Sequence, residues 1–247
     1  MSMLTTLSAV IPNKKVKMPG AQLRSILFDL DGTLLDTAPD LAAALNHVLV
    51  SNGRQALPFE TIRPWVSHGG LVLIKNGFNI TQDAPEFDDL RQQLLDFYRN
   101  NLSVKTRLFA GMNEVLLKLE KSGIKWGVVT NKPAWLTVPL LDELQLTNRS
   151  SCVISGDTLS ERKPHPLPLQ HACELIGCDV SESLYVGDAQ RDIEAGINAK
   201  MPTLIALFGY ISDIDYPENW GANGLIDSPL EILNWVHQHY DTDGLCP

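Results

Sequence analysis

Asp29 and Asp31 are two carboxylates that stand directly after the apolar run 25–28 and directly before Gly32 and Thr33. In an open α/β sheet, ligands bind beyond the carboxyl ends of the strands, so both side chains are expected at a ligand site. A purely structural polar turn is disfavoured, because an unpaired charge at the end of a buried strand is costly. The pair therefore indicates catalysis or cation binding.

Polar residues that suit a cation or a phosphate also follow the later apolar runs. Two further carboxylates stand four residues apart, and a hydroxyl, an amide and a lysine open a predicted helix. A helix N-terminus attracts phosphate oxygens, and magnesium prefers a few carboxylates together with water and substrate oxygens. The combination predicts Mg²⁺ and a phosphate-bearing small molecule. In chain order these groups are Thr130, Asn131, Lys132, Lys163, Asp188 and Asp192.

The elements that must position these groups alternate between short apolar runs and helix-like segments. This alternation is typical of α/β proteins, in which helices cover a parallel sheet. We therefore predict a Rossmann-like, doubly wound parallel sheet. Strands are expected near 25–29, 124–130, 152–154, 183–187 and 202–206, and helices near 112–122, 134–145, 166–177, 190–199 and 229–239.

Residues 38–107 break this alternation, because they show helical periodicity and no clear strand. Thr37 is a candidate cap for the first of their helices. We predict an all-helical cap domain at 38–107, inserted into a catalytic core formed by 22–37 and 108–247. Residues 1–21 are predicted to be a flexible leader. A signal peptide is disfavoured there, because its lysines would precede the apolar stretch, whereas here they follow it.

Composition narrows the class of partner. The 247 residues carry 20 Lys and Arg against 29 Asp and Glu, a net charge of −9, so neither nucleic acid nor anionic lipid is expected as a partner. No apolar run is long enough to span a membrane, and the four cysteines lack zinc-ligand spacing. We predict a cytoplasmic enzyme that is a monomer or a homodimer.

Four motifs carry a resemblance to a known family. DLDGTLLDT, the VVTN ending of the second run, the lysine in RKPHP, and GDAQRD resemble, in that order, the motifs of the haloacid dehalogenase superfamily. The resemblance spans nearly the whole predicted core. It implies an Mg²⁺-dependent phosphatase that hydrolyses a phosphate monoester through a covalent aspartyl-phosphate. A dehalogenase is disfavoured, because family members with that activity lack the second carboxylate, supplied here by Asp31.

The resemblance also implies a role for each matching catalytic residue. Asp29 resembles the nucleophile, which is also a metal ligand. Asp31 resembles the general acid, and its backbone carbonyl resembles a further metal ligand. Thr130 and Asn131 resemble the phosphate-binding motif, and Lys163 resembles the lysine that neutralises the phosphate as the carboxylate attacks it.

The remaining motif residues are expected to bind metal and substrate. Asp188 resembles the direct metal ligand. Asp192 is predicted to bind the metal, directly or through a bridging water, and the alternative is that it orients Lys163. Gly32 and Thr33 are predicted to contact the substrate.

Within the predicted cap, residues 63–70 resemble the Arg-x-Trp-Val-Gly-x-Gly stretch of the phosphoglycolate phosphatase branch. Ser67 departs from this pattern, which has glycine at that position. Arg63 and His68 are predicted to meet a substrate carboxylate. The alternative is that Arg63 forms a surface ion pair and His68 is an ordinary loop residue.

The predicted substrate is 2-phosphoglycolate, and N-acetylmuramic acid 6-phosphate is the alternative, because similar chains are assigned to either compound. Both join a carboxylate to a phosphate monoester, and the four motifs contact only the phosphate. A β-phosphoglucomutase and a non-catalytic phospho-ligand-binding protein are further alternatives. Hydrolysis of para-nitrophenyl phosphate with and without magnesium would separate an enzyme from a binding protein.

Overall fold

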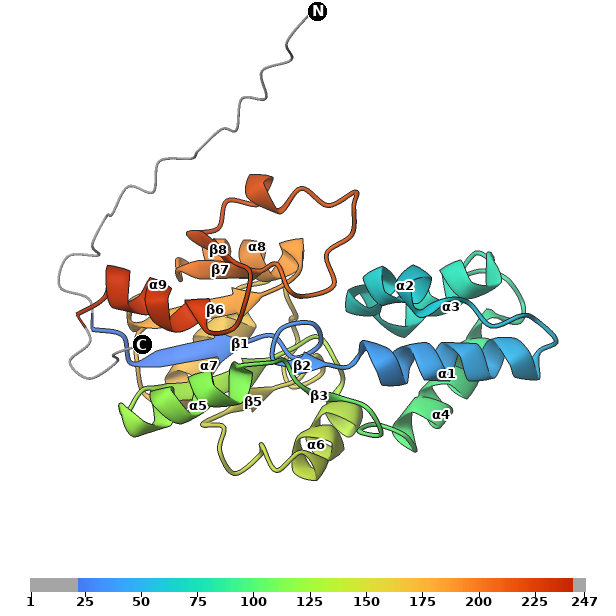
Figure 1. Ribbon diagram of the computed structural model, residues 1–247, viewed down its shortest axis with the longest axis horizontal. Helices are drawn as coiled ribbons and strands as arrows, with labels where there is room; N and C mark the ends of the chain where they lie inside the picture. The colour runs from blue at the N-terminus through green and yellow to red at the C-terminus, as the bar shows by residue number, and fades with distance from the viewer. Residues whose placement is uncertain (1–21, 242–247) are drawn as a thin grey trace, which may run out of the picture.

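One six-stranded parallel sheet forms the centre of the protein in the computed structural model, which describes residues 22–241 (Figure 1). The predicted leader 1–21 lies outside the described residues. The strands are β1 (Ser25–Phe28), β4 (Lys125–Val129), β5 (Val153–Ile154), β6 (Ser183–Gly187), β7 (Thr203–Ala206) and β8 (Gly224–Ile226). Their order is β5-β4-β1-β6-β7-β8, so the first strand lies inside the sheet. This arrangement confirms the predicted doubly wound α/β fold.

Five helices alternate with these strands and cover the sheet. Each begins and ends close to the positions expected from the sequence, because its apolar residues recur at helical spacing. Within residues 22–241, every helix is too short or too polar to cross a lipid bilayer. The helices are α5 (Met112–Lys121), α6 (Ala134–Glu143), α7 (Leu167–Ile176), α8 (Gln190–Ala199) and α9 (Glu231–His239).

Side chains of β1 alternate between two hydrophobic layers, because successive strand residues point to opposite faces of a sheet. Ile26 and Phe28 belong to a layer that includes α5, α6 and α9. Leu27 belongs to the layer that includes α7 and α8. All three side chains are fully buried, so β1 is the strand around which both layers assemble.

Two short pairings were not predicted from the sequence. β2 (Leu35–Asp36) and β3 (Arg107–Leu108) form an antiparallel pair at the two ends of the helical insertion, and β8 extends the sheet at one edge. The expectation of no strand within 38–107 is therefore wrong at Arg107. Strands this short show no periodicity from which a sequence pattern could predict them.

The segment between β2 and β3 contains only helices among its regular elements, and Figure 1 shows them grouped beside the sheet, past the end of β1. We call residues 38–107 the cap; its status as a separate domain stays a prediction. Contacts of α1 with α3, α4 and η1 hold the group together. The elements are α1 (Ala38–Ser51), α2 (Phe59–Ile62), the 3₁₀ helix η1 (Arg63–His68), α3 (Gly69–Phe78) and α4 (Phe87–Arg99).

Two polar side chains secure the entry to the cap. Thr37 precedes α1, but its side chain makes no capping hydrogen bond, so the predicted cap is wrong. Its hydroxyl instead donates to Asp31 Oδ1 at 2.7 Å. The buried Asp40 carboxylate accepts the backbone N–H groups of Lys105 and Thr106 at 2.8 to 3.0 Å. Asp40 therefore ties the beginning of the cap to its end.

Candidate active site

Asp29, Thr130 and Asp188 each directly follow one of three neighbouring strands. β1 pairs in parallel with both β4 and β6, so the three residues share the edge formed by the carboxyl ends. The chain passes from β1 to β4 on one side and later returns to β6 on the other. Open α/β sheets bind ligands at such a switch point. The sheet thus brings together groups that are far apart in the sequence.

Lys163 lies at the centre of a buried ionic cluster. Its Nζ atom is 2.8 Å from Asp29 Oδ1 and 2.8 Å from Asp192 Oδ1. It also donates hydrogen bonds to the Val129 carbonyl at 2.9 Å and to the Tyr185 hydroxyl at 2.7 Å. Because the Lys163 side chain is only 1% exposed, carboxylates rather than water balance its charge.

The acidic side chains at this edge are close enough to share a cation. Asp29, Asp188 and Asp192 each offer an oxygen within 4.8 Å of the others, and all three are buried. Burial raises the pKa of Asp29 to about 6, and the charge of Asp192 adds to the rise. Burial, and then the charge of Asp29, raises the pKa of Asp188 to about 7. A crowded, all-oxygen set of this kind fits Mg²⁺, whose charge would relieve the repulsion.

Both carboxylate oxygens of Asp192 already contact protein donors. Oδ1 pairs with Lys163, and Oδ2 accepts the backbone N–H of Ala189 at 3.0 Å. Burial alone would raise the pKa of Asp192, but the charges of Lys163 and Arg191 outweigh it and lower the pKa. These contacts fit the predicted role of Asp192 in orienting Lys163, and a contact with metal stays a prediction.

Asp188 is held by three donors. The Thr33 hydroxyl donates to Oδ1 at 3.2 Å, and the Ser67 hydroxyl and the Tyr210 backbone N–H donate to Oδ2 at 2.8 and 2.9 Å. Gly32 has a φ of 89°, and a Cβ there would lie 2.2 Å from Asp188 Oδ2, so only glycine fits. Gly32 and Thr33 thus support Asp188, while their contact with substrate stays a prediction.

A second lysine orients Asp31. Lys132 Nζ lies 2.9 Å from Asp31 Oδ1, the oxygen that also accepts the Thr37 hydroxyl. The same Nζ donates to the hydroxyl of Tyr98, on α4, at 2.9 Å. Burial opposes the charge on Lys132, but the charge of Asp31 outweighs it and raises the lysine pKa. Within residues 22–241, Asp31 Oδ2 has no protein donor, so it remains available to a ligand.

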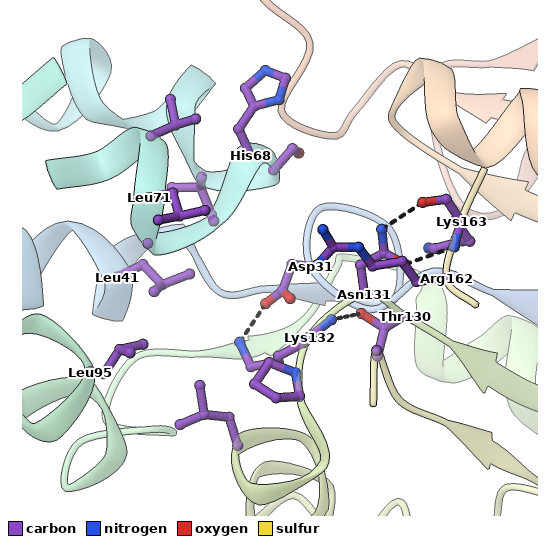
Figure 2. A pocket seen from close by; sticks show the side chains of 18 of the residues that line it. Asp31, Leu41, His68, Leu71, Leu95, Thr130, Asn131, Lys132, Arg162 and Lys163 are labelled. Carbon is purple, nitrogen blue, oxygen red and sulfur yellow. Dashed lines mark hydrogen bonds and ion pairs between the residues drawn. The ribbon is translucent and has the colours of Figure 1, made fainter. Parts of the chain in front are cut away.

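A cavity of about 750 Å³ lies between the cap and these catalytic groups. Figure 2 shows Leu41, His68, Leu71 and Leu95 of the cap on one side of it, opposite the polar groups of the core. Six of the site residues predicted from the sequence line this cavity: Asp29, Asp31, His68, Thr130, Asn131 and Lys163. Five others do not line it: Gly32, Thr33, Arg63, Asp188 and Asp192.

The loops after β4 and β5 are tied together by a reciprocal pair of hydrogen bonds. Asn131 Nδ2 donates to the Lys163 carbonyl at 2.9 Å, and the Lys163 N–H donates to Asn131 Oδ1 at 3.1 Å. The Thr130 hydroxyl oxygen accepts the backbone N–H of Lys132 at 3.1 Å. The Asn131 side chain is thus engaged in fixing Lys163 at the edge of the cavity.

The two cap residues predicted to bind a carboxylate differ in their surroundings. Arg63 donates to the Phe208 carbonyl at 3.1 Å, and its guanidinium lies 5.0 Å from the centre of the Tyr210 ring. It therefore contacts the core rather than the cavity. His68 lines the cavity, and burial, followed by the charge of Arg191, lowers its pKa.

Several contacts at the site were not predicted from the sequence. Lys132 was expected near the phosphate, because it directly follows Thr130 and Asn131, but its pairing with Asp31 was not predicted. The contacts of Tyr98 and Ser67 could not be predicted, because each meets the core only through a tertiary contact. At Ser67 the chain departs from the family pattern, and the extra hydroxyl is the group that reaches Asp188.

The geometry agrees with a family assignment from comparison with known proteins. The family model for haloacid dehalogenase-like hydrolases matches residues 26–206. The chain belongs to this family, which confirms the resemblance found in the four motifs.

Similar curated relatives carry two different names. The chain is 41% identical over 211 residues to an N-acetylmuramic acid 6-phosphate phosphatase of Pseudomonas putida, an alignment that covers 85% of this chain and 95% of that protein. It is also 41% identical over 209 residues to a phosphoglycolate phosphatase of Xanthomonas campestris, covering 85% and 94%. Among solved structures, a predicted phosphoglycolate phosphatase from Haemophilus somnus matches with a TM-score of 0.77 and 30% identity, covering 88% and 99%.

Proposed function

We propose that this hydrolase is a magnesium-dependent phosphatase that uses Asp29 as a covalent nucleophile on a carboxylated sugar phosphate. The protein is a phosphoric monoester hydrolase of the haloacid dehalogenase-like family, like the relatives it matches. The observation that carries the proposal is the Asp29–Lys163 pair at the floor of the cavity, beside two further buried aspartates.

Asp29 is arranged to attack with one oxygen. Its Oδ1 is held by Lys163 at 2.8 Å and by the N–H of Leu30 at 2.7 Å. Its Oδ2 has no protein donor within residues 22–241, and the residue lines the cavity. In our proposal Oδ2 attacks phosphorus, the ester oxygen leaves, and an aspartyl-phosphate forms. Lys163 neutralises charge on the phosphoryl oxygens, which favours attack by an anion.

Asp31 supplies the proton that the leaving alkoxide needs. Lys132 and Thr37 hold its Oδ1, which leaves Oδ2 without a protein donor within residues 22–241, and Asp31 lines the cavity together with Asp29. After transfer, the same carboxylate is a base that removes a proton from the water attacking the aspartyl-phosphate. A bound Mg²⁺ would be held by Asp29, the Asp31 carbonyl and Asp188, and its charge would stabilise the phosphoryl group.

The size of the cavity favours the larger of the two candidate substrates. Pockets for drug-sized ligands occupy about 300–1,000 Å³, and this one has about 750 Å³. Ser67 on Asp188 and Tyr98 on Lys132 already join cap and core, so this is the volume with the cap in contact with the core. A two-carbon acid would leave most of it empty.

The lining of the cavity points the same way. Leu41, Leu71, Leu95 and Trp135 contribute apolar surface to it, and Leu71 and Trp135 are 39% and 40% exposed. The acetamido and lactyl methyl groups of N-acetylmuramic acid 6-phosphate would cover such surface, whereas 2-phosphoglycolate has no methyl group. The cavity therefore favours N-acetylmuramic acid 6-phosphate as the substrate over 2-phosphoglycolate, the substrate predicted from the sequence.

2-Phosphoglycolate remains the second candidate, because relatives with that name match as well as those with the other. Phosphate release should be measured on both compounds and on para-nitrophenyl phosphate, with Mg²⁺ and with excess chelator. We expect turnover that requires Mg²⁺, with the highest kcat/KM for the sugar phosphate. Binding without turnover of any ester would contradict the enzymatic proposal, and a higher kcat/KM for 2-phosphoglycolate would contradict only the substrate.

A further inference from the structure

Arg91 is a cavity-lining cation without a protein partner. It lies on α4 of the cap and is half-buried. Its Nε atom is buried and makes no hydrogen bond, and no group within residues 22–241 pairs with its guanidinium. Its two terminal nitrogens are not buried, so they are accessible to a ligand. A partly desolvated cation with no counter-charge is unfavourable unless a ligand supplies one.

The other cations that line the cavity either pair with protein groups or, in the case of the exposed Arg162, lie at the phosphate end. Lys163 and Lys132 pair with catalytic aspartates. Arg191 donates to the Ser67 carbonyl at 2.8 Å. Arg162 lies beside Lys163 and Asn131 in Figure 2, at the phosphate end. Arg91 is therefore the free arginine at the cap end of the cavity.

The position of Arg91 on its helix sets its distance from the reacting groups. Tyr98, seven residues later on α4, touches Lys132 beside Asp31. Seven residues of α-helix rise about 10 Å, and helical side chains lean toward the N-terminus, away from Tyr98. The guanidinium is thus held about two helical turns from the phosphate end.

We infer that Arg91 binds the substrate carboxylate at the end of the cavity remote from Asp29. A guanidinium presents two parallel N–H groups that match a carboxylate. In 2-phosphoglycolate the carboxyl carbon is only about 4 Å from phosphorus by standard bond lengths, which is too short to reach. In N-acetylmuramic acid 6-phosphate the sugar ring separates the two anionic groups. The inference rests on the proposed phosphatase function, and Arg91 takes the role that the sequence had suggested for Arg63.

The test compares two sugar phosphates that differ only in the lactyl group, which carries the carboxylate, and adds 2-phosphoglycolate as a carboxylated ester without the sugar. N-acetylglucosamine 6-phosphate is the same sugar phosphate without the lactyl ether. We expect Arg91→Ala to lower kcat/KM for N-acetylmuramic acid 6-phosphate by about thirtyfold or more, as for other desolvated charged contacts. The loss should lie mainly in KM. N-acetylglucosamine 6-phosphate and 2-phosphoglycolate should lose far less, and Arg91→Lys should fall between Arg91→Ala and the unchanged protein for the carboxylated sugar.

Lys75→Ala provides the matched control. Lys75 is an exposed cation on α3 of the cap that does not line the cavity, so this change removes the same charge away from the ligand. It should leave all three substrates unaffected. Equal losses on every substrate in Arg91→Ala, or no loss on any, would overturn the assignment of Arg91.

A binding measurement separates this inference from the proposed function. In an Asp29→Asn background, calorimetry would measure the affinity of N-acetylmuramic acid 6-phosphate with Arg91 present and replaced by alanine. We expect a loss of about thirtyfold, and unchanged affinity would overturn the inference whether or not turnover occurs. Absence of turnover in the unchanged protein, together with this loss, would contradict the phosphatase proposal and leave the Arg91 site standing.

Discussion

The two ends of the cavity differ in how their charged groups are balanced. At the core end, Lys163 contacts two carboxylates, a carbonyl and a tyrosine hydroxyl, and Lys132 pairs with Asp31. At the cap end, Arg91 lines the cavity together with apolar side chains such as Leu71 and Leu95, and it has no partner within residues 22–241. The core end is therefore held in shape by the protein itself, whereas the cap end needs a ligand to complete it.

This difference indicates that the core end performs phosphoryl transfer and the cap end selects the substrate. A phosphoryl-transfer site must keep its nucleophile and cations in place through the reaction, and paired groups do this with no reorganisation at the moment of attack. A site that selects the rest of the substrate gains most from groups that the free protein leaves unpaired, because the correct ligand satisfies them and a wrong one does not. Changes at the core end should thus lower activity on every ester, and changes at the cap end should alter the choice among esters.

The largest effect is expected from the nucleophile. Asp29→Asn keeps the shape of the side chain and removes its nucleophilic charge, so turnover should fall by more than about a thousandfold on all substrates. Because Asp29 is a buried carboxylate crowded by Asp192, the melting temperature should be unchanged or higher. Steady-state kinetics and calorimetric melting would measure both. Residual activity above about a thousandth of the original would show that another group is the nucleophile.

Removal of the metal should also abolish activity on every substrate, because the metal is expected to bind at the core end. Activity should disappear in excess chelator, return with Mg²⁺ and be inhibited by Ca²⁺, which takes more oxygens at longer distances. At a hundred times its dissociation constant, Mg²⁺ should stabilise the fold by about 2.7 kcal/mol. An increase in melting temperature with Mg²⁺ that is lost in Asp188→Asn would assign the ion to this cluster. Full activity in chelator would rule out the metal.

A smaller loss is expected when Asp31 loses its lysine. Lys132→Met breaks a pair whose side chains are 6% and 16% exposed, and removing one partner of a buried pair costs about 3–5 kcal/mol. We expect a lower melting temperature and a kcat reduced by about tenfold to a hundredfold, part of the contribution of a general acid. Tyr98→Phe removes only one hydrogen bond to Lys132 and should cost about 1 kcal/mol. An unchanged kcat in Lys132→Met would mean that Thr37 alone orients Asp31.

The smallest effect should come from Arg63, and it should be the same for all substrates. Arg63 bonds the Phe208 carbonyl and stacks on Tyr210, contacts worth about 0.5–2 kcal/mol. Arg63→Ala should therefore lower kcat/KM for carboxylated and carboxylate-free esters alike, by weakening the hold of the cap on the core. A loss confined to carboxylated esters would restore the role predicted from the sequence and move the carboxylate away from Arg91.

The sequence by itself determined the fold class and the chemistry of the core end. The apolar runs at 25–28 and 183–187 end in Asp29 and Asp188, and strand polarity alone places such residues at one edge of a parallel sheet. The two-residue strands β2 and β3 were missed, because they carry no periodicity. Asp29, Thr130 and Asp188 could be placed because each directly follows the strand that positions it, whereas Lys163 lies between β5 and α7 and was assigned from the motif resemblance.

Only the tertiary structure decided which cations are free. Nothing in the residues around Arg63 indicates that its guanidinium meets the carbonyl of Phe208, 145 positions later, or that Arg91 meets no partner at all within residues 22–241. Lys132 likewise depends on Tyr98 and Asp31, which come from the cap and from the loop after β1. Long-range packing determines whether a charged side chain pairs with another protein group or remains available to a ligand. Local sequence patterns do not contain that information.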